Sequence, residues 1–431
     1  MKSVQICIEI NGQQIEAGNI SGSSEQGYSF TYDPVYLGRP DAAPLSQSLP
    51  LQEETFSPGQ TRNFFEGLLP EGFTRKSVAQ WLHESDHDYF AILSRLGSEC
   101  LGAIQVIQQD NDLPLLKPRY RRLSAEEVKN LAREGAMMSA ELVTKSHISL
   151  TGASGKAGLY FDSKSGYWFL PQGTAPSTHI VKQSHVRLQS IVANEQLSQM
   201  TAAKLGIEIP ESFIINLGSG EDEDVLLATR RYDRIFDPGS QKIDGLPVPY
   251  RLHQEDFAQA LGISADEKYE TQFHGEHGYL PVMFRLIREA SQNPLEDQLK
   301  LWDRIVFCFL LGNTDCHLKN FSLLYDKGLR SARLAPAYDM VSTAVYESGT
   351  RDMSFYIGDQ LSLDELNENS FEEAAGLCRM NAKPAMRRFY KLADAFEGAL
   401  KSSCRQLKEM GIPHVEAIRD KILLRGGFHR I

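Results

Sequence analysis

The sequence of 431 residues lacks the marks of several protein classes. It has no apolar run that approaches membrane-spanning length, and its first ten residues alternate like a strand instead of forming an apolar signal segment. Its six cysteines are scattered, with no Cys-x-x-Cys pair and no framework spacing. These absences argue against a membrane protein and a disulfide scaffold, and they predict reduced thiols in a cytoplasmic protein.

Excess positive charge is also absent. The formal net charge of −11 argues against broad nonspecific binding of nucleic acid by the whole surface. The one compact basic run, Lys117–Arg122, predicts a solvated linker in preference to a phosphate-binding patch. With 42% apolar residues, a chain of this length can build two or three packed bodies.

The most informative stretch is Gly312–Asn320, read together with Asp339. Asp315 precedes Asn320 by five residues, and Asp339 follows nineteen residues later. In kinases an aspartate accepts the proton of the substrate hydroxyl, while an asparagine and a second aspartate hold magnesium. The spacing predicts Asp315 as the proton acceptor and Asn320 with Asp339 as Mg²⁺ ligands. A polar turn explains the nonapeptide alone equally well.

Regular structure is predicted around this loop. Apolar side chains at helical spacing predict a buried helix over residues 295–311 that ends near Gly312. Short strands are predicted at residues 321–325 and 332–334. The candidate ligands would therefore lie at the ends of rigid elements.

A kinase also needs a lysine for the nucleotide phosphates and an acid that holds this lysine. Lys182 ends the β-branched run His179–Lys182, as expected of a strand lysine that faces a cleft. Glu195 lies in the first turn of the next predicted helix, Ala193–Leu205, where the helix dipole favours a carboxylate. This order favours a Lys182–Glu195 pair over an unpartnered helix acid, with Asn194 as a neighbour that could be confused with Glu195.

Upstream lies a loop rich in glycine and serine, which is a candidate for cradling phosphates because glycine lets backbone N–H groups come close. It lacks the spacing of a Walker A motif and of the G-x-G-x-x-G loop, so a Gly/Ser hairpin is the alternative. The candidate residues are Thr151, Gly152, Ala153, Ser154, Gly155 and Lys156.

Several motifs occur together in one order, and they cover almost the whole chain. In this order the sequence resembles the HipA family, the serine/threonine kinase toxins of bacterial toxin–antitoxin modules. The motifs are Phe64–Gly72, Ser149–Lys156, His179–Lys182, Arg230–Arg234, Arg251–Gly262, Gly312–Ser322 and Pro336–Asp339.

The resemblance implies an α+β fold of two lobes, similar to protein and lipid kinases, with a β-rich N-terminal subdomain and a mainly helical C-terminal lobe. The implied boundaries are 1–115 for the subdomain, 116–250 for the nucleotide-binding lobe with its glycine-rich loop, and 251–431 for the helical lobe. Helices are expected near residues 384–403 and 413–424, and a capping box at Ser124 predicts a helix to about Ala136.

The resemblance also implies further roles in binding ATP. Arg230, Arg231 and Tyr232 would line the adenine side, and His317 and Lys319 would lie near the phosphates. Leu318 and Tyr338 belong to the same matched motifs and are expected at the ATP site.

Ser149 matches the serine on which family members phosphorylate and inactivate themselves. Ser154 and Gly155 depart from the commoner family pattern, so Thr151 and Ser154 are rival phosphoacceptors. No Asp-Phe-Gly follows the catalytic loop, because Met340 comes after Asp339.

The favoured function is a toxin that phosphorylates a translation component, such as glutamyl-tRNA synthetase or another aminoacyl-tRNA synthetase. The implied cofactors are ATP and Mg²⁺, and the implied partners are a HipB-like antitoxin and, through it, operator DNA. Two alternatives are a pseudokinase-like corepressor of a DNA-binding antitoxin and a kinase of a lipid or small molecule, which His317 suggests.

Overall fold

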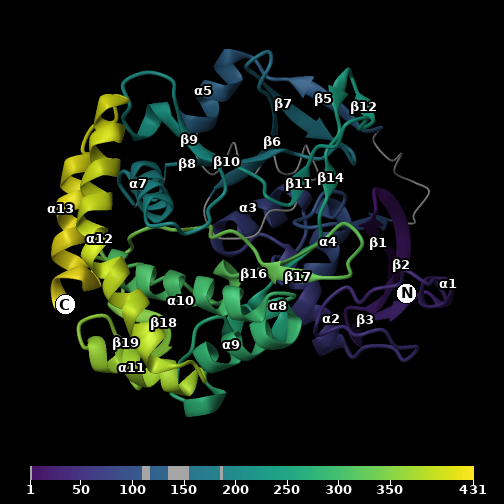
Figure 1. The fold of residues 1–431 in the computed structure, drawn as a ribbon. Coiled ribbons are helices and arrows are strands. Elements are labelled where there is room, and N and C mark those ends of the chain that lie inside the picture. The colour runs from purple at the N-terminus through teal and green to yellow at the C-terminus, as the bar shows by residue number, and fades with distance from the viewer. Residues whose placement is uncertain (1, 109–116, 134–154, 185–187) are drawn as a thin grey trace. The chain divides into compact units, whose positions relative to one another are not determined.

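The computed structural model describes residues 2–108, 117–133, 155–184 and 188–431 (Figure 1). The chain divides into two compact units whose sequences interleave. Unit 1 comprises Met1–His185, Ala228–Ala265 and Leu324–Ala332, and unit 2 comprises Val186–Leu227, Asp266–Leu323 and Arg333–Ile431.

Unit 1 begins with an antiparallel sheet in the order β3-β2-β1-β4. Its strands are β1 (Lys2–Ile10), β2 (Gln13–Ser23), β3 (Gly27–Tyr32) and β4 (Ile104–Gln108). The apolar residues that alternate along β1 are all buried, which confirms the predicted strand. The helical elements that follow β3 are α1 (Pro34–Leu37), α2 (Pro58–Phe65), η1 (Glu66–Leu68), α3 (Gly72–Leu82) and α4 (Tyr89–Leu96).

A second antiparallel group in unit 1 has the order β5-β7-β6-β8. Its strands are β5 (Arg119–Arg122), β7 (Tyr167–Gln172), β6 (Lys156–Asp162) and β8 (His179–Gln183). The predicted linker at Lys117–Arg122 is therefore wrong for its last four residues, which pair with β7. Tyr120 fixes β5 because its ring packs 4.5 Å from that of Tyr160, and the Arg122 guanidinium lies 3.3 Å from the Tyr167 ring. The arginines of β5 suggested an exposed linker, although the side chain of Tyr120 between them is buried in the strand.

The remaining elements of unit 1 are short. They are α5 (Ala125–Arg133), β11 (Arg234–Ile235), β12 (Lys242–Ile243), β13 (Leu246–Pro247), β14 (Tyr250–Arg251), β15 (Gln254–Asp256) and α8 (Phe257–Leu261). The predicted capping box of α5 is confirmed: the Glu127 N–H donates to Ser124 Oγ at 3.2 Å, and the Ser124 N–H donates to Glu127 Oε2 at 2.9 Å.

A buried network of charges ties unit 1 together. Glu99 is fully buried between three guanidinium groups, with Nη1 of Arg231 at 3.0 Å and Nη2 of Arg234 at 2.8 Å from its Oε1. Arg251 Nη2 lies 2.9 Å from Glu99 Oε2. Asp233 bridges Arg231 and Arg234 from the other side. The arginines hold the pKa of Glu99 below its usual value although burial alone would raise it.

Unit 2 is built mainly from helices. They are α7 (Ile191–Lys204), α9 (Tyr279–Ala290), α10 (Pro294–Leu311), α11 (Glu368–Leu377), α12 (Ala382–Glu409) and α13 (Val415–Arg425). Helix α12 packs against α7, α10, α11 and α13; in Figure 1 α7 is teal, α10 is green, and α11, α12 and α13 run from yellow-green to yellow. The bounds of α7 and α10 confirm the helices predicted over 193–205 and 295–311. None of the helices in the described part of the chain has the length and apolarity to cross a membrane.

Short strands complete unit 2. They are β9 (Ser212–Asn216) and the hairpin of β18 (Asp352–Ile357) with β19 (Gln360–Ser362). Strands β10 (Val225–Arg230), β16 (Ser322–Tyr325) and β17 (Ala332–Leu334) lie where the chain passes from one unit to the other. The last two confirm the strands predicted on either side of Asp326–Gly328.

Candidate catalytic site

The catalytic loop begins where α10 ends. Gly312 takes the left-handed conformation, with φ of 72°, and its N–H bonds to carbonyl groups of the last helical turn. A Cβ at this position would lie 2.7 Å from Ala344 Cβ, so only glycine fits without displacing its neighbour. The helix therefore stops sharply and releases the chain into the loop.

Asp315 is the one exposed side chain among residues 312–319, and 51% of its side-chain surface is open to solvent. Its neighbours are anchored. The Thr314 N–H donates to Thr343 Oγ1 at 2.7 Å, and Ser354 Oγ donates to the Thr314 carbonyl at 2.8 Å. The predicted proton acceptor thus stands on a rigid base, with about half of its side-chain surface open to solvent.

Asn320 is held by its own side chain. Its Nδ2 donates to the Asp315 carbonyl at 2.7 Å, which closes the loop across the short helix η5 (Leu318–Asn320). With the amide nitrogen used in this way, the carbonyl oxygen Oδ1 is the end of the side chain that can serve as a ligand.

Tyr338 connects this loop to the second predicted ligand. Its hydroxyl donates to the Lys319 carbonyl at 2.9 Å and lies 2.6 Å from Ser322 Oγ. The next residue, Asp339, adopts φ of 52°, a left-handed conformation that few residues other than glycine adopt. Asn313 Nδ2 lies 3.4 Å from the Asp339 carbonyl. A strained backbone held by neighbouring hydrogen bonds is typical of functional sites.

Asn194 also holds the Asp339 segment, a role that the sequence analysis missed. This fully buried side chain exchanges two hydrogen bonds with the backbone of Ser342, Nδ2 to the carbonyl at 2.8 Å and N–H to Oδ1 at 3.1 Å. The residue that the sequence offered only as a neighbour of Glu195 therefore ties α7 to the chain just after Asp339.

The donor set of Asn320 and Asp339 fits magnesium. Mg²⁺ prefers oxygen ligands and takes one or two from protein, with the rest from phosphate and water. One amide oxygen and one carboxylate, both carried on anchored backbone, meet that requirement. In the described part of the chain no group of three or more His, Cys, Asp or Glu side chains forms a metal cage.

The other predicted residues of the loop are buried. Leu318 is fully buried in the core, so any contact with a ligand would use its backbone. His317 and Lys319 are each 6% exposed, and His317 Nε2 lies 4.0 Å from Asp315 Oδ1. Cys316 is buried, and its hydrogen bond to Cys308 and burial raise the pKa of its thiol well above the usual value. This thiol is therefore protected from ionisation.

A tyrosine outside every motif contacts the predicted proton acceptor. The Tyr269 hydroxyl donates to Asp315 Oδ1 at 2.5 Å, and the Tyr269 ring meets the His317 ring edge-on with centroids 5.1 Å apart. The contact spans 46 positions in sequence. Sequence spacing gave no signal for it, because Tyr269 lies in an irregular polar segment.

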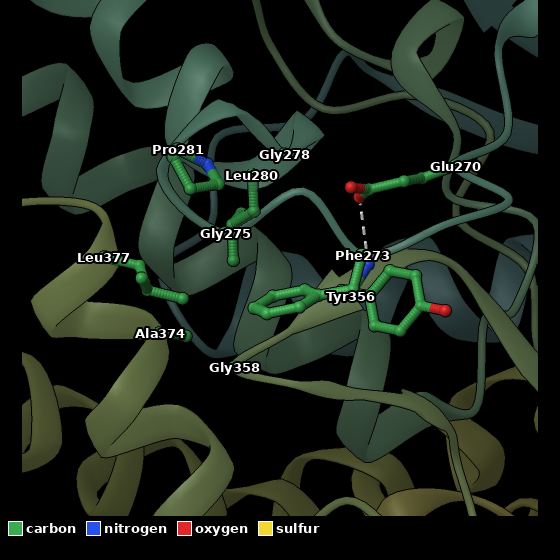
Figure 2. A pocket seen from close by; sticks show the side chains of 10 residues that line it. All are labelled: Glu270, Phe273, Gly275, Gly278, Leu280, Pro281, Tyr356, Gly358, Ala374 and Leu377. Atoms are coloured by element: carbon green, nitrogen blue, oxygen red, sulfur yellow. Dashed lines mark hydrogen bonds between the residues drawn. The ribbon is translucent and has the colours of Figure 1, made fainter.

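Glu270 holds this segment in place (Figure 2). It is 5% exposed, and its Oε2 accepts the N–H groups of Tyr279 and Tyr356, both at 3.2 Å. The Glu270 N–H donates to the Ser354 carbonyl at 2.8 Å. Burial raises the pKa of Glu270. Figure 2 shows the carboxylate at the edge of a small hollow with Phe273, Leu280 and Tyr356, so the backbone beside Tyr269 is fixed on α9 and β18.

The predicted phosphate-binding lysine lies in unit 1. Lys182 on β8 stands directly opposite Lys156 on β6, so both side chains lie on one face of the sheet. Lys156, predicted in the glycine-rich loop, is in fact the first residue of a strand. Gly155 precedes it and is buried. Ser149, Thr151, Gly152, Ala153 and Ser154 lie outside the described residues.

The arginine motif needs a correction. All five N–H donors of Arg231 are used inside the network, by Asp233, Glu99, Ser177 and the Cys100 carbonyl. Its guanidinium therefore has no donor left for adenine, and the predicted role of this side chain in binding ATP is replaced by a structural one.

The two neighbours of Arg231 are more accessible. Arg230 is exposed at the end of β10, and the half-buried Tyr232 donates its hydroxyl to Gln254 Oε1. Glu195 belongs to unit 2, where it is 6% exposed and accepts a hydrogen bond from Gln199 Nε2 at 3.0 Å. Its pairing with Lys182, which lies in unit 1, stays a prediction.

Comparison with known proteins identifies the family. Residues 148–400 match the HipA-like C-terminal domain, and residues 8–107 match the HipA N-terminal domain. The first match alone covers more than half of the sequence. The chain belongs to the HipA family.

Its relatives cover most of the chain. Y4mE of Sinorhizobium fredii, named as a candidate kinase, is 32% identical over 401 residues, which are 90% of this chain and 89% of Y4mE. The serine/threonine-protein kinase toxin HipA of Shewanella oneidensis is 29% identical over 326 residues, 74% of this chain and 71% of the toxin.

A solved structure confirms the predicted α+β fold of the HipA family. HipA of Shewanella oneidensis, determined with HipB and operator DNA, has a TM-score of 0.78 and 24% identity to this chain. The superposition covers 98% of this chain and 96% of that one.

Proposed function

We propose that the protein is an ATP- and Mg²⁺-dependent serine/threonine protein kinase and the toxin of a toxin–antitoxin module. The observation that carries this proposal is the half-exposed side chain of Asp315 on a loop otherwise buried, together with the hydrogen bonds that hold the Asn320 side chain and the Asp339 backbone. A protein that only binds an antitoxin has no physical need for an exposed base beside two oxygen ligands held by side-chain hydrogen bonds.

Asp315 would accept the proton of the attacking serine or threonine hydroxyl. Phosphoryl transfer depends mostly on positioning and electrostatics, so the protein's task is to orient the hydroxyl and to balance charge. Asn320 and Asp339 would hold magnesium, which neutralises charge on the phosphates when bound. The loop geometry supports this assignment because hydrogen bonds hold the Asn320 side chain and the Asp339 backbone.

Lys156 and Lys182 support a site for phosphates. The register of β6 and β8 places these two lysines directly opposite each other on one face of the sheet, and two ammonium groups there could contact the oxygens of a polyanion. Lys182 would contact the nucleotide phosphates, with the Gly152–Gly155 loop over them. Arg230 and Tyr232 would line the adenine side.

The family supports the wider role. The Shewanella oneidensis relative is named a serine/threonine-protein kinase toxin, and its solved complex contains HipB and operator DNA. We assign to this chain a HipB-like antitoxin partner, contact with operator DNA through that antitoxin, and a protein substrate of the translation machinery in the cytoplasm. An aminoacyl-tRNA synthetase such as glutamyl-tRNA synthetase is the candidate substrate, and Ser149 the site of self-inactivation.

The test is transfer of radiolabelled phosphate from ATP in the presence of magnesium, to the chain itself and to a purified glutamyl-tRNA synthetase. Asp315→Asn should lower the rate by about three orders of magnitude, because it removes the proton acceptor but keeps the shape. Equal labelling by the wild type and the variant would refute the assignment. Absence of labelling in both, with retained binding to the antitoxin, would favour the corepressor.

A further inference from the structure

The contact between Tyr269 and Asp315 has a chemical consequence for the proposed kinase. We propose that the Tyr269 hydroxyl occupies the position of the phosphoacceptor hydroxyl, so that a substrate must displace this side chain before transfer. The inference rests on the proposed function, since it names the residue that controls entry to that same site.

The Tyr269 hydroxyl lies at about the distance from Asp315 that is expected of a phosphoacceptor hydroxyl. A hydroxyl about to lose its proton must lie within hydrogen-bond reach of the base, about 2.6–3.2 Å between heavy atoms. The Tyr269 oxygen lies 2.5 Å from Asp315 Oδ1, as short as a charge-assisted bond between a hydroxyl and a carboxylate. A serine or threonine oxygen cannot reach the same carboxylate oxygen along the same direction while the phenol is there.

The position of Tyr269 is built into the fold. Its neighbour Glu270 is bonded through both its N–H and its carboxylate to α9 and β18, and Phe273 packs 5.3 Å from the Tyr356 ring. Consecutive Cα atoms are about 3.8 Å apart, so this anchoring fixes the backbone of Tyr269 as well.

The side chain itself can move. The residue is 42% exposed, and the Asp315 side chain is 51% exposed, so rotation of the phenol into solvent meets no buried wall. The contacts that it would give up include the hydrogen bond to Asp315, the edge-on contact with His317 and the Lys268 ammonium group, which lies 5.3 Å from the centre of the Tyr269 ring. A fixed backbone with a rotatable side chain is what a displaceable stand-in for the substrate requires.

Water is the simplest competitor for this position. While the phenol lies on Asp315, a water molecule cannot take the acceptor place, and wasteful hydrolysis of ATP is suppressed. A hydrogen bond to a charged group corresponds to a factor of about ten to a hundred in an equilibrium constant. Removal of the Tyr269 hydroxyl should raise, by a comparable factor, the fraction of molecules in which water can occupy the acceptor position beside Asp315.

The experiment compares Tyr269→Phe with a matched control in the same segment, Tyr279→Phe. The Tyr279 hydroxyl donates to the Glu267 carbonyl at 2.5 Å, so the control also loses one phenol hydrogen bond. Release of ADP from Mg-ATP, with no acceptor added, should rise about tenfold in Tyr269→Phe and stay within about twofold of wild type in Tyr279→Phe. Labelling of dephosphorylated casein should rise in parallel.

Two results would overturn the proposal. An unchanged rate would show that the hydroxyl does not compete for the site. A fall, with Mg-ATP binding and melting temperature unchanged, would show that Tyr269 assists Asp315 and does not block it. The double variant with Asp315→Asn should show no gain, because the gain requires a working base.

A measurement without catalysis separates this proposal from the proposed function. With 3-fluorotyrosine in the full chain, the resonance that Tyr269→Phe removes should shift on Asp315→Asn. If no protein turns over ATP, the kinase assignment fails, and a shifted resonance still supports the Tyr269 contact. A resonance unaffected by Asp315→Asn would overturn the contact itself, whatever the activity.

Discussion

Replacement of the buried Glu99 by glutamine should destabilise the protein more than a glutamate-to-glutamine substitution at an exposed position. The fully buried carboxylate contacts Arg231, Arg234 and Arg251, and the network is charge-balanced by Asp233 and Glu9. The Glu99→Gln substitution would leave one buried positive charge without compensation. Removing one member of a buried ion pair costs about 3–5 kcal/mol, which corresponds to a fall of about 6–20 °C in the melting temperature of a unit of this size.

The assay is thermal and denaturant unfolding of the full chain near neutral pH. Glu397→Gln is a matched control, because Glu397 Oε1 lies 2.6 Å from Lys401 Nζ at an exposed position where such pairs contribute about 0.3–0.5 kcal/mol. If the unfolding free energy lost in Glu99→Gln lies within about 1 kcal/mol of that lost in Glu397→Gln, the view that charge compensation in the network stabilises unit 1 is refuted. The arginines lower the pKa of Glu99 in the folded protein. The contribution of the Glu99 carboxylate to stability should therefore be present at pH values above the usual carboxylate pKa and be lost as the pH falls below that pKa.

Three further outcomes can be measured. Expression of the chain alone should slow growth, and Asp339→Ala should relieve this effect by removing a proposed magnesium ligand. A catalytically dead variant that is as toxic as wild type would contradict the mechanism. Incubation with Mg-ATP should place phosphate on Ser149 and abolish ATP binding, because the added charge would compete for Lys182; mass spectrometry that finds phosphate only on Thr151 or Ser154 would count against it. Burial raises the pKa of Glu255 to about 7, with hydrogen bonds from Ser46 and Tyr325 opposing the shift. The folded state then holds this proton to a higher pH than the unfolded chain does. The free energy of unfolding should therefore fall by on the order of 3 kcal/mol between about pH 4.5 and 7 and stay level above pH 7. Glu255→Gln should remove this pH dependence in denaturant titrations.

Local pattern was sufficient where a residue's role depends on its neighbours in sequence. The helix before the catalytic loop, its end at Gly312 and the strands on either side of Asp326 follow from helical spacing, glycine conformation and short apolar runs. Asp315, Asn320 and Asp339 could be proposed as site residues because kinase chemistry requires a recurring order of side chains, and their roles stay predictions.

Contacts between distant residues could not be read in the same way. Tyr269 meets Asp315 across 46 positions, and Arg231 meets Glu99 across 132. An arginine that binds a nucleotide and one that fills a buried network look alike in sequence, since both are charged residues at the end of a strand. Likewise, the sequence suggested that Arg119–Arg122 is solvated, because its pairing with β7 and the burial of Tyr120 depend on residues about 50 positions away.

The interleaving of the two units has a consequence for biosynthesis. Unit 1 needs Leu324–Ala332 in addition to its two earlier segments, so a ribosome must deliver about three quarters of the chain before this unit can close. Domains usually fold as they emerge, N-terminal first, at about 5–20 residues per second. Here neither unit is a contiguous segment, and a truncated product that ends before residue 324 lacks part of both. The growing chain therefore cannot complete either unit until most of its residues have been made.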